Sequence, residues 1–295
     1  MPDPQAPTTA RPVRGAARNR GLEQSRQALL PDLDPGITLL DIDGDRGVPV
    51  LQSLVLDRLL TRGGPAFWVD AQGHATTAGL AQLAPSRRLL DRIHVARGFT
   101  AYQHYSAVRD LQGAVERHVR DGATRDPFEQ RDAAPESDGD SSLTPSLVVA
   151  PAIDAMYRAD DALPEDRAST LQARCLATLA RYAEGYDVPV LVTRQRDDAF
   201  TTPVETRADR VLRCVRTDMG PRFVGDGFET LVYPVDDGSH YQTTLAYWHE
   251  ILARRARQAG LSPAGPDSTA GGEPTVGDAA GPDPVADALA GLGGR

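Results

Sequence analysis

Two glycines, Gly44 and Gly47, follow the apolar run Ile37–Ile42 at the point where a strand would turn into a helix. Glycine-rich turns in this position let backbone N–H groups converge on phosphate oxygens, so the turn is a candidate for nucleotide binding. Three acidic residues surround the same turn and would repel a triphosphate: Asp41, Asp43 and Asp45. The glycines therefore allow the backbone conformation of a phosphate-binding loop, but the three aspartates give the turn the wrong charge for a phosphate.

The same stretch also begins like a calcium-binding loop. DIDGD (41–45) supplies carboxylates at alternate positions, but the twelfth position from Asp41 holds Gln52 instead of a bidentate Glu, so we expect no calcium. The six histidines show no spacing typical of metal ligation, and we expect His104 and His118 on the solvent-facing side of a helix. Cys175 recurs with leucines at helical spacing, which predicts a core residue.

Composition excludes several classes of protein. The 295 residues contain 32 basic and 41 acidic side chains, for a net charge of −9, and every basic residue is Arg. An acidic chain is not expected to adhere non-specifically to nucleic acid or to anionic lipid. The absence of Lys and the excess of Asp over Glu are typical of a halophilic archaeon, although a GC-rich genome produces the same bias.

Location also has to be inferred from composition. No apolar run reaches 18 residues and no apolar segment follows the N-terminus, so we expect neither a membrane span nor a secretory signal. Two cysteines are too few for a disulfide framework and favour a reducing compartment. The expected location is cytoplasmic, with no membrane partner.

Strand and helix signals alternate along the middle of the chain, which predicts the α/β class: a mostly parallel central sheet flanked by helices. The expected strands are 37–42, 65–70, 93–95, 147–150 and 188–193. The expected helices are 50–60, 102–120, 164–184 and 243–258. Three later strands, 210–216, 222–224 and 229–235, are expected to pair antiparallel at one edge of the sheet.

Flanking segments differ from this core in composition. Residues 1–21 form an expected flexible arm, and 259–295, rich in Gly, Pro and Asp, an expected disordered tail. The core domain spans 22–258 and contains an acidic insertion loop at 121–145.

Several strings, in their order along the chain, resemble the RecA/RadA recombinase core of the P-loop NTPase superfamily. They are AFWVDAQG (66–73), RIHVARGFTAYQHYSAV (92–108), LVVAPAIDAMYRA (147–159) and VPVLVTRQ (188–195). The resemblance is nearest to the archaeal RadA and RadB branch, with KaiC-like proteins as the wider group. It covers roughly residues 36–235 and implies a RecA-like fold.

The resemblance also implies a degenerate nucleotide site. Gly44 and Gly47 match the first two glycines of the Walker A loop, and Gln195 matches the sensor glutamine, although Gln195 could equally be a structural polar residue. Gln72 stands at the position of the catalytic Glu, and an amide cannot accept the proton of an attacking water.

The remaining catalytic positions are replaced as well. Pro49 takes the next glycine position, Val50 that of the Walker A Lys, Leu51 that of the Ser or Thr that ligates Mg²⁺, and Pro151 that of the Walker B acid. Arg46 is a candidate substitute cation, but its planar guanidinium is not equivalent to a compact ammonium. We therefore expect no ATP hydrolysis, and neither ATP nor Mg²⁺ as a resident cofactor.

The family's two DNA-contacting loops correspond here to an acidic stretch, ADDALPED (159–166), and to the residues after Gln195. In the second loop Phe200 is a candidate for stacking on a base, although a hydrophobic plug explains it more simply. A basic group follows as the candidate for phosphate contacts: Arg207, Arg210, Arg213 and Arg216.

The function that these observations favour is a non-catalytic RecA/RadA-like paralogue, an accessory or regulatory protein in DNA recombination or repair that docks onto an active recombinase homologue. Two alternatives stay open. One is a divergent P-loop protein that binds ATP weakly; the other is a module that binds single-stranded DNA through Phe200 and the arginines after it.

Overall fold

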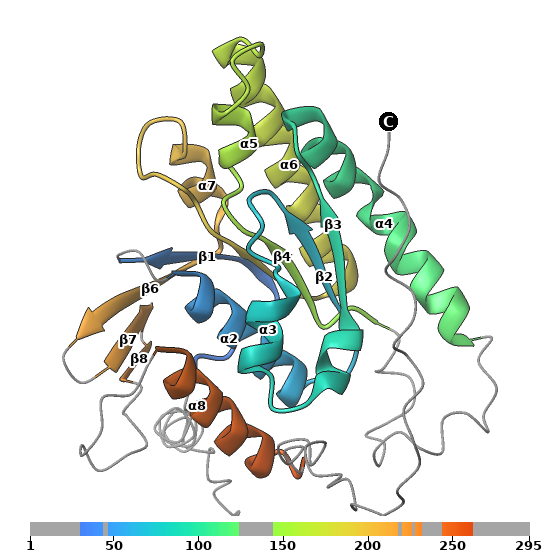
Figure 1. The fold of residues 1–295 in the computed structure, drawn as a ribbon. Coiled ribbons are helices and arrows are strands. Elements are labelled where there is room, and N and C mark those ends of the chain that lie inside the picture. Colours follow the sequence, from blue (N-terminus) through green and yellow to red (C-terminus); the bar gives the residue numbers. More distant parts are fainter. Residues whose placement is uncertain are drawn as a thin grey trace, which may run out of the picture. The chain divides into compact units, whose positions relative to one another are not determined.

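One sheet of eight strands runs through the part of the chain that the computed structural model describes, residues 30–43, 47–123, 144–217, 220–225, 228–231 and 244–261. The parallel strands are β1 (Gly36–Ile42), β2 (Ala66–Asp70), β3 (Ile93–Arg97), β4 (Leu147–Ala150), β5 (Pro189–Val192) and β6 (Arg210–Thr217). Two antiparallel strands follow at the β6 edge, β7 (Gly220–Gly225) and β8 (Phe228–Leu231). The order across the sheet is β3-β2-β4-β5-β1-β6-β7-β8 (Figure 1).

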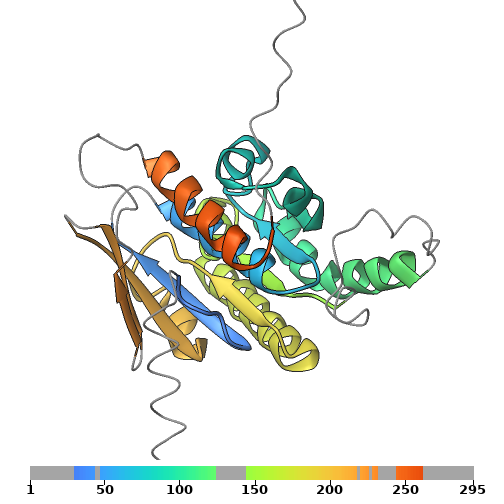
Figure 2. The ribbon, with the colours of Figure 1, turned by 90° about the horizontal axis from the view of Figure 1, so that it is seen from below.

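Helices cover both faces of this sheet. One face carries α2 (Gly47–Thr61), α3 (Thr77–Leu83), the 3-10 helix η1 (Arg87–Arg92) and α8 (Thr244–Gln258). The other face carries α4 (Ala101–Ala123), α5 (Ala155–Arg158), α6 (Glu165–Tyr186) and α7 (Thr202–Arg207). Figures 1 and 2 show α8 beside α2 and α3, on the opposite side of the sheet from α6. The expected α/β class, with a mostly parallel sheet and late antiparallel strands, is confirmed.

Two hydrophobic layers result, because successive side chains of a strand point to opposite faces. In β4, Val148 packs into the layer beneath α4 and α6, and Val149 packs into the layer beneath α2 and α8. All four residues of β4 are buried, as expected of a strand covered on both sides. Cys175 and Cys214 are buried free cysteines, one in each layer.

One helix is longer than expected, and another ends where expected. α4 continues to Ala123, into the expected insertion; residues 124–143 lie outside the described part, as do 1–29 and 262–295. After α8, Gly260 adopts a φ of 76°, and the N–H of Leu261 donates to the carbonyl of Ala256. This left-handed turn satisfies a carbonyl in the last turn of the helix, and Leu261 packs against the hydrophobic core.

The predictions for two histidines are wrong. His104 is 0% exposed, because the inner stripe of α4 includes it between Ala101 and Val108. The His118 ring, expected in solvent, lies 4.8 Å from the ring of His94 on β3, measured between centroids. The described residues contain no group of three metal-binding side chains around this pair.

None of the described helices combines the length and apolar character that crossing a membrane requires.

Candidate functional site

A cavity of about 410 Å³ opens at the carboxyl ends of the parallel strands, beside the first turn of α2. Three residues that the sequence predicted for nucleotide binding line it: Gly47, Gln72 and Gln195. They come from the loops after β1, β2 and β5, whose carboxyl ends meet at the same edge of the sheet. This edge is where ligands bind in open α/β sheets. Gly44 and Arg46 lie outside the described residues.

Gly47 begins α2 in close contact with the strand before it. A Cβ at this position would lie 3.3 Å from the Cδ1 of Ile42, so little space separates the turn from the sheet. Pro49, the third residue of α2, has no N–H, so this helix start offers fewer donors to an anion than an ordinary one. The Ser53 hydroxyl donates to the Pro49 carbonyl at 2.7 Å and stays within the helix.

The main charged group of the cavity is Arg194, which sequence reasoning missed. Its guanidinium contacts three carboxylates, Asp41 at 3.0 Å, Asp197 at 2.7 Å and Glu205 at 3.4 Å, and its side chain is only 4% exposed. Burial would lower the pKa of Arg194, but the hydrogen bond and charge of Asp41 and the charges of the other two acids raise it above its usual value. Arg194 is therefore a permanently charged side chain whose charge is already compensated.

This ion-pair cluster determines what the cavity can bind. Among the charged residues that line it, Asp41 and Asp197 balance Arg194 and Arg196. His74, also in the lining, has a lowered pKa because burial outweighs the nearby charge of Asp70, so it adds no positive charge at pH 7. The described lining is thus polar without the excess of positive charge that a triphosphate needs.

Asp70, at the end of β2, holds the loop that carries Gln72. Its buried carboxylate accepts hydrogen bonds from the backbone N–H groups of His74 at 2.9 Å and Ala75 at 3.3 Å. Arg97, at the end of the adjacent β3, lies 3.4 Å from the same carboxylate and donates to the Ala75 carbonyl. These contacts give Asp70 a structural role, while the side chain of Gln72 is exposed at the cavity.

The end of β4 has a similar internal arrangement. Ala152, two residues after the strand, has a φ of 46°, and its N–H donates to the Thr193 hydroxyl at 2.8 Å. The carboxylate of Asp154, 0% exposed, accepts the N–H of Gln195 at 2.7 Å and the Nε–H of Arg158 at 2.6 Å. The acid nearest to the Walker B-like position therefore fixes the loop after β5, and each of its oxygens already has a partner.

The candidate DNA contacts are more dispersed than the sequence suggested. Phe200 is half-buried against the core, and the Arg158 guanidinium lies 4.6 Å from the centre of its ring. Arg207 ends α7, whereas the other three arginines lie on β6 at a spacing of three. Since faces alternate along a strand, Arg213 is on the opposite face from Arg210 and Arg216.

One of these arginines already has partners. Arg210 donates to the carbonyls of Asp34 and Pro35 at 3.1 and 3.2 Å, and its guanidinium lies 3.6 Å from the Asp34 carboxylate. The group therefore does not form one continuous basic face, and DNA contact through it stays a prediction.

Comparisons with known proteins do not assign the site. No model of a protein family matches the chain, and a search of curated proteins finds no related sequence.

Proposed function

We propose that this chain is a RecA/RadA-like protein without ATP hydrolysis, and that it acts as an accessory or regulatory protein in DNA recombination or repair. The RecA-like assignment is supported by the resemblance of its strings and by the arrangement of three strands. β4, β5 and β1 are neighbours, so the strand before the glycine turn, the Walker B-like strand and the sensor-like strand all end beside one cavity.

The loss of hydrolysis is supported above all by Arg194. To meet a γ-phosphate, its guanidinium would have to leave Asp41 and Asp197. Asp41 is 32% and Asp197 72% exposed, so separating Arg194 from either of them costs about 1 kcal/mol or less. The separation would, however, leave two uncompensated carboxylates beside the phosphate. No Lys exists in the chain to take its place.

A second candidate function, weak nucleotide binding without hydrolysis, is favoured by one observation. Gly47, Gln72 and Gln195 line the same cavity, whose volume of about 410 Å³ is within the range of small-molecule sites. Amide side chains and a helix start could hold the sugar and base of a nucleotide even where the phosphates are poorly bound.

Turnover of ATP in the presence of Mg²⁺ and molar KCl tests the loss of hydrolysis. We expect a rate no higher than that of buffer alone, because Gln72 stands at the position of the water-orienting Glu and Val50 at that of the Walker A Lys. Gln72→Ala should leave that background rate unchanged, as should Gln82→Ala, a matched control on the exposed surface of α3. Turnover well above background that Gln72→Ala removes, and Gln82→Ala retains, would overturn this part of the proposal.

The accessory role needs its own measurement. Added in equimolar amounts to an active recombinase from the same organism, the protein should change the rate of DNA-dependent ATP hydrolysis or of strand exchange. Rates that stay the same across a titration to tenfold excess would contradict that role.

A further inference from the structure

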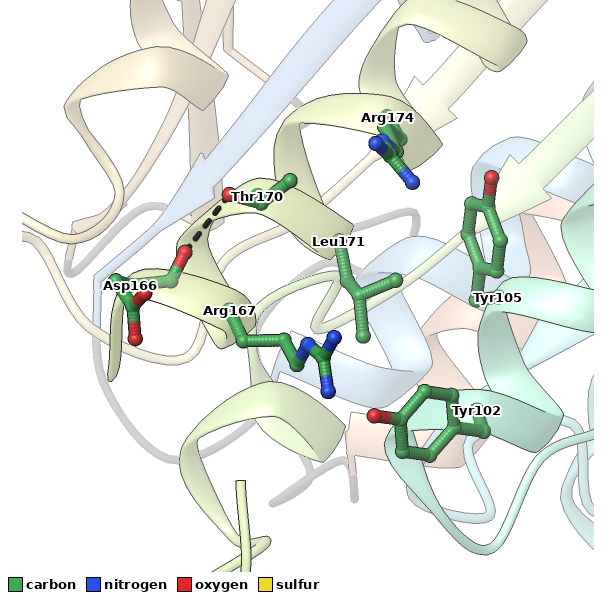
Figure 3. Close-up of a pocket in the computed structure, with 7 residues that line it drawn as sticks. All are labelled: Tyr102, Tyr105, Asp166, Arg167, Thr170, Leu171 and Arg174. Carbon is green, nitrogen blue, oxygen red and sulfur yellow. Dashed lines mark hydrogen bonds between the residues drawn. The ribbon is translucent and has the colours of Figure 1, made fainter. Parts of the chain in front are cut away.

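A second cavity, of about 540 Å³, lies between the N-terminal halves of α4 and α6. Tyr102 and Tyr105 line it from α4, and Arg167, Leu171 and Arg174 line it from α6, as Figure 3 shows. It shares no lining residue with the cavity at the strand ends. Of the stretch 159–166 that the resemblance assigns to a DNA-contacting loop, only Asp166 lines this cavity.

The polar groups that point into this cavity are mainly hydrogen-bond donors. Arg167 and Arg174 are seven residues apart, two turns along one face of α6, and neither forms an ion pair with any described residue. The two phenol groups add O–H donors from the opposite wall. In Figure 3 the carboxylate of Asp166 lies on the far side of Arg167 from the tyrosines, so it does not fill the space between them.

The first turn of α6 is not itself the anion site, because it carries two acidic residues, Glu165 and Asp166. The positive groups of the cavity are the guanidinium groups of Arg167 and Arg174, and Arg174 lies two turns further along the helix. Arginine side chains form charge-assisted, often bidentate hydrogen bonds with phosphate, so these two favour a phosphate over a cation.

The opposite wall offers a free aromatic surface. Tyr102 is 52% exposed, whereas the Arg109 guanidinium already lies 5.9 Å from the centre of the Tyr105 ring. Phe99, 78% exposed, precedes Tyr102 by three residues, and Leu171 provides an apolar contact between the two arginines. An exposed ring beside unpaired arginines is the combination that binds a base together with its phosphate.

We propose that the α4–α6 cavity binds a nucleotide unit, with the phosphate between Arg167 and Arg174 and the base stacked on Tyr102. Its volume is within the range of small-molecule sites and leaves room for a single unit. A free mononucleotide and one nucleotide of a single strand present the same chemistry. This site does not depend on the proposed function, because no residue of the strand-end cavity takes part in it.

The test measures binding of dAMP and of a fluorescent single-stranded dT oligomer, with inorganic phosphate and a poly-glutamate peptide as competitors. Arg167→Ala, Arg174→Ala and Tyr102→Ala should each weaken binding by about tenfold, since each removes a charge-assisted contact or a stacking partner. Tyr102→Phe keeps the ring and should bind nearly as tightly as the wild type.

Two controls separate this site from the rest of the molecule. Arg181→Ala removes an Arg from the same helix, two turns beyond Arg174 and outside the cavity lining, and should have little effect. Gln72→Ala alters only the strand-end cavity. Nucleotide binding that is unchanged in this variant therefore does not depend on Gln72 in the strand-end cavity. For the oligomer, Arg167→Ala should also reduce the slope of log K against log salt by about 0.7, as one lost phosphate contact predicts.

Each result of the binding experiment either supports or overturns the proposed α4–α6 site. Binding of dAMP and of the oligomer, with the losses described, supports the site and identifies a mononucleotide as sufficient. Binding of the oligomer alone supports the site and identifies the single strand as the ligand. Competition by poly-glutamate equal to that of dAMP, or affinities that are the same in Tyr102→Ala and Tyr102→Phe, would overturn it, as would no binding of either nucleotide ligand at millimolar concentration.

Discussion

His104 connects three helices through buried hydrogen bonds. Its Nδ1 lies 2.9 Å from the Tyr157 hydroxyl, which in turn lies 2.7 Å from the Cys175 sulfur, so the chain of contacts runs from α4 through α5 to α6. Burial lowers the pKa of His104 to about 4, although the charge of Asp70 opposes the shift. A His that is neutral when folded and charged when unfolded makes stability depend on pH.

The sign of that dependence follows from the two pKa values. Above pH 6.5 His104 is neutral in both states; as the pH falls toward 4, only the unfolded chain takes up the proton, so stability is lost. The difference of about 2.5 units corresponds to about 3 kcal/mol. Urea denaturation measures the free energy of unfolding at pH 7 and at pH 4. Between these two pH values it should fall by about 3 kcal/mol less in His104→Phe than in the wild type, because the variant has no histidine at position 104 to take up a proton on unfolding.

His249→Gln, which removes an exposed His of α8, is the control. It should reproduce the pH dependence of the wild type. Parallel pH profiles for His104→Phe and the wild type would contradict the buried, neutral state of His104.

Residue positions within the candidate site were predictable only in part. Gly47, Gln72 and Gln195 each follow a strand, and the ends of parallel strands meet at one edge, so their meeting could be inferred from the order of elements. The ion pairs of Arg194 could not, because they depend on the register of β1 against β5 and on where α7 places Glu205. The one available signal was an Arg directly after a buried strand beside an acidic turn.

At the scale of elements, strands and helices were easier to predict than their ends. The run 147–150 is a strand with the expected limits, because an apolar stretch between polar turns leaves little choice. The inner stripe of α4 consists of Ala101, His104, Val108, Leu111 and Val115, whereas His104 was expected in solvent. A polar residue in an apolar stripe is easily assigned to the wrong face.

The junction between β3 and α4 depends on Gly98. A Cβ there would lie 2.5 Å from the Cα of His104 and 2.6 Å from its backbone nitrogen, and backbone cannot give way as a side chain can. Gly98→Ala should therefore destabilise the protein by about 2 kcal/mol or more, by forcing α4 away from the strand. The midpoint of urea unfolding measures this loss.

Gly113→Ala is the matched control within α4. Its new Cβ would meet only the end of the flexible Arg117 side chain, at 3.3 Å. Because Ala favours a helix over Gly by about 1 kcal/mol, this variant should be as stable as the wild type or more so. A Gly98→Ala protein as stable as Gly113→Ala would show that the junction is looser than described.

For the molecule as a whole, the net charge of −9 is the dominant electrostatic fact. Like charges repel most in the compact state, and salt screens them: the Debye length is about 10 Å at 0.1 M and about 3 Å at 1 M. Raising KCl from 0.1 to 2 M at pH 7.5 should therefore raise the midpoint of thermal unfolding by several degrees. Near pH 5.2, where the net charge vanishes, the gain should be smaller; an equal or larger gain there would rule out screening as its cause.

The two thiols, one in each hydrophobic layer, make each layer separately observable. Cys175 is 0% and Cys214 3% exposed, and burial raises the pKa of both to about 12, so alkylating reagents reach them only when the covering helices open. Peptide mapping after timed labelling can then tell whether the α4–α6 side or the α2–α8 side of the sheet opens first. The labelling rates of these two native thiols therefore report the opening of the two layers separately, without an engineered probe.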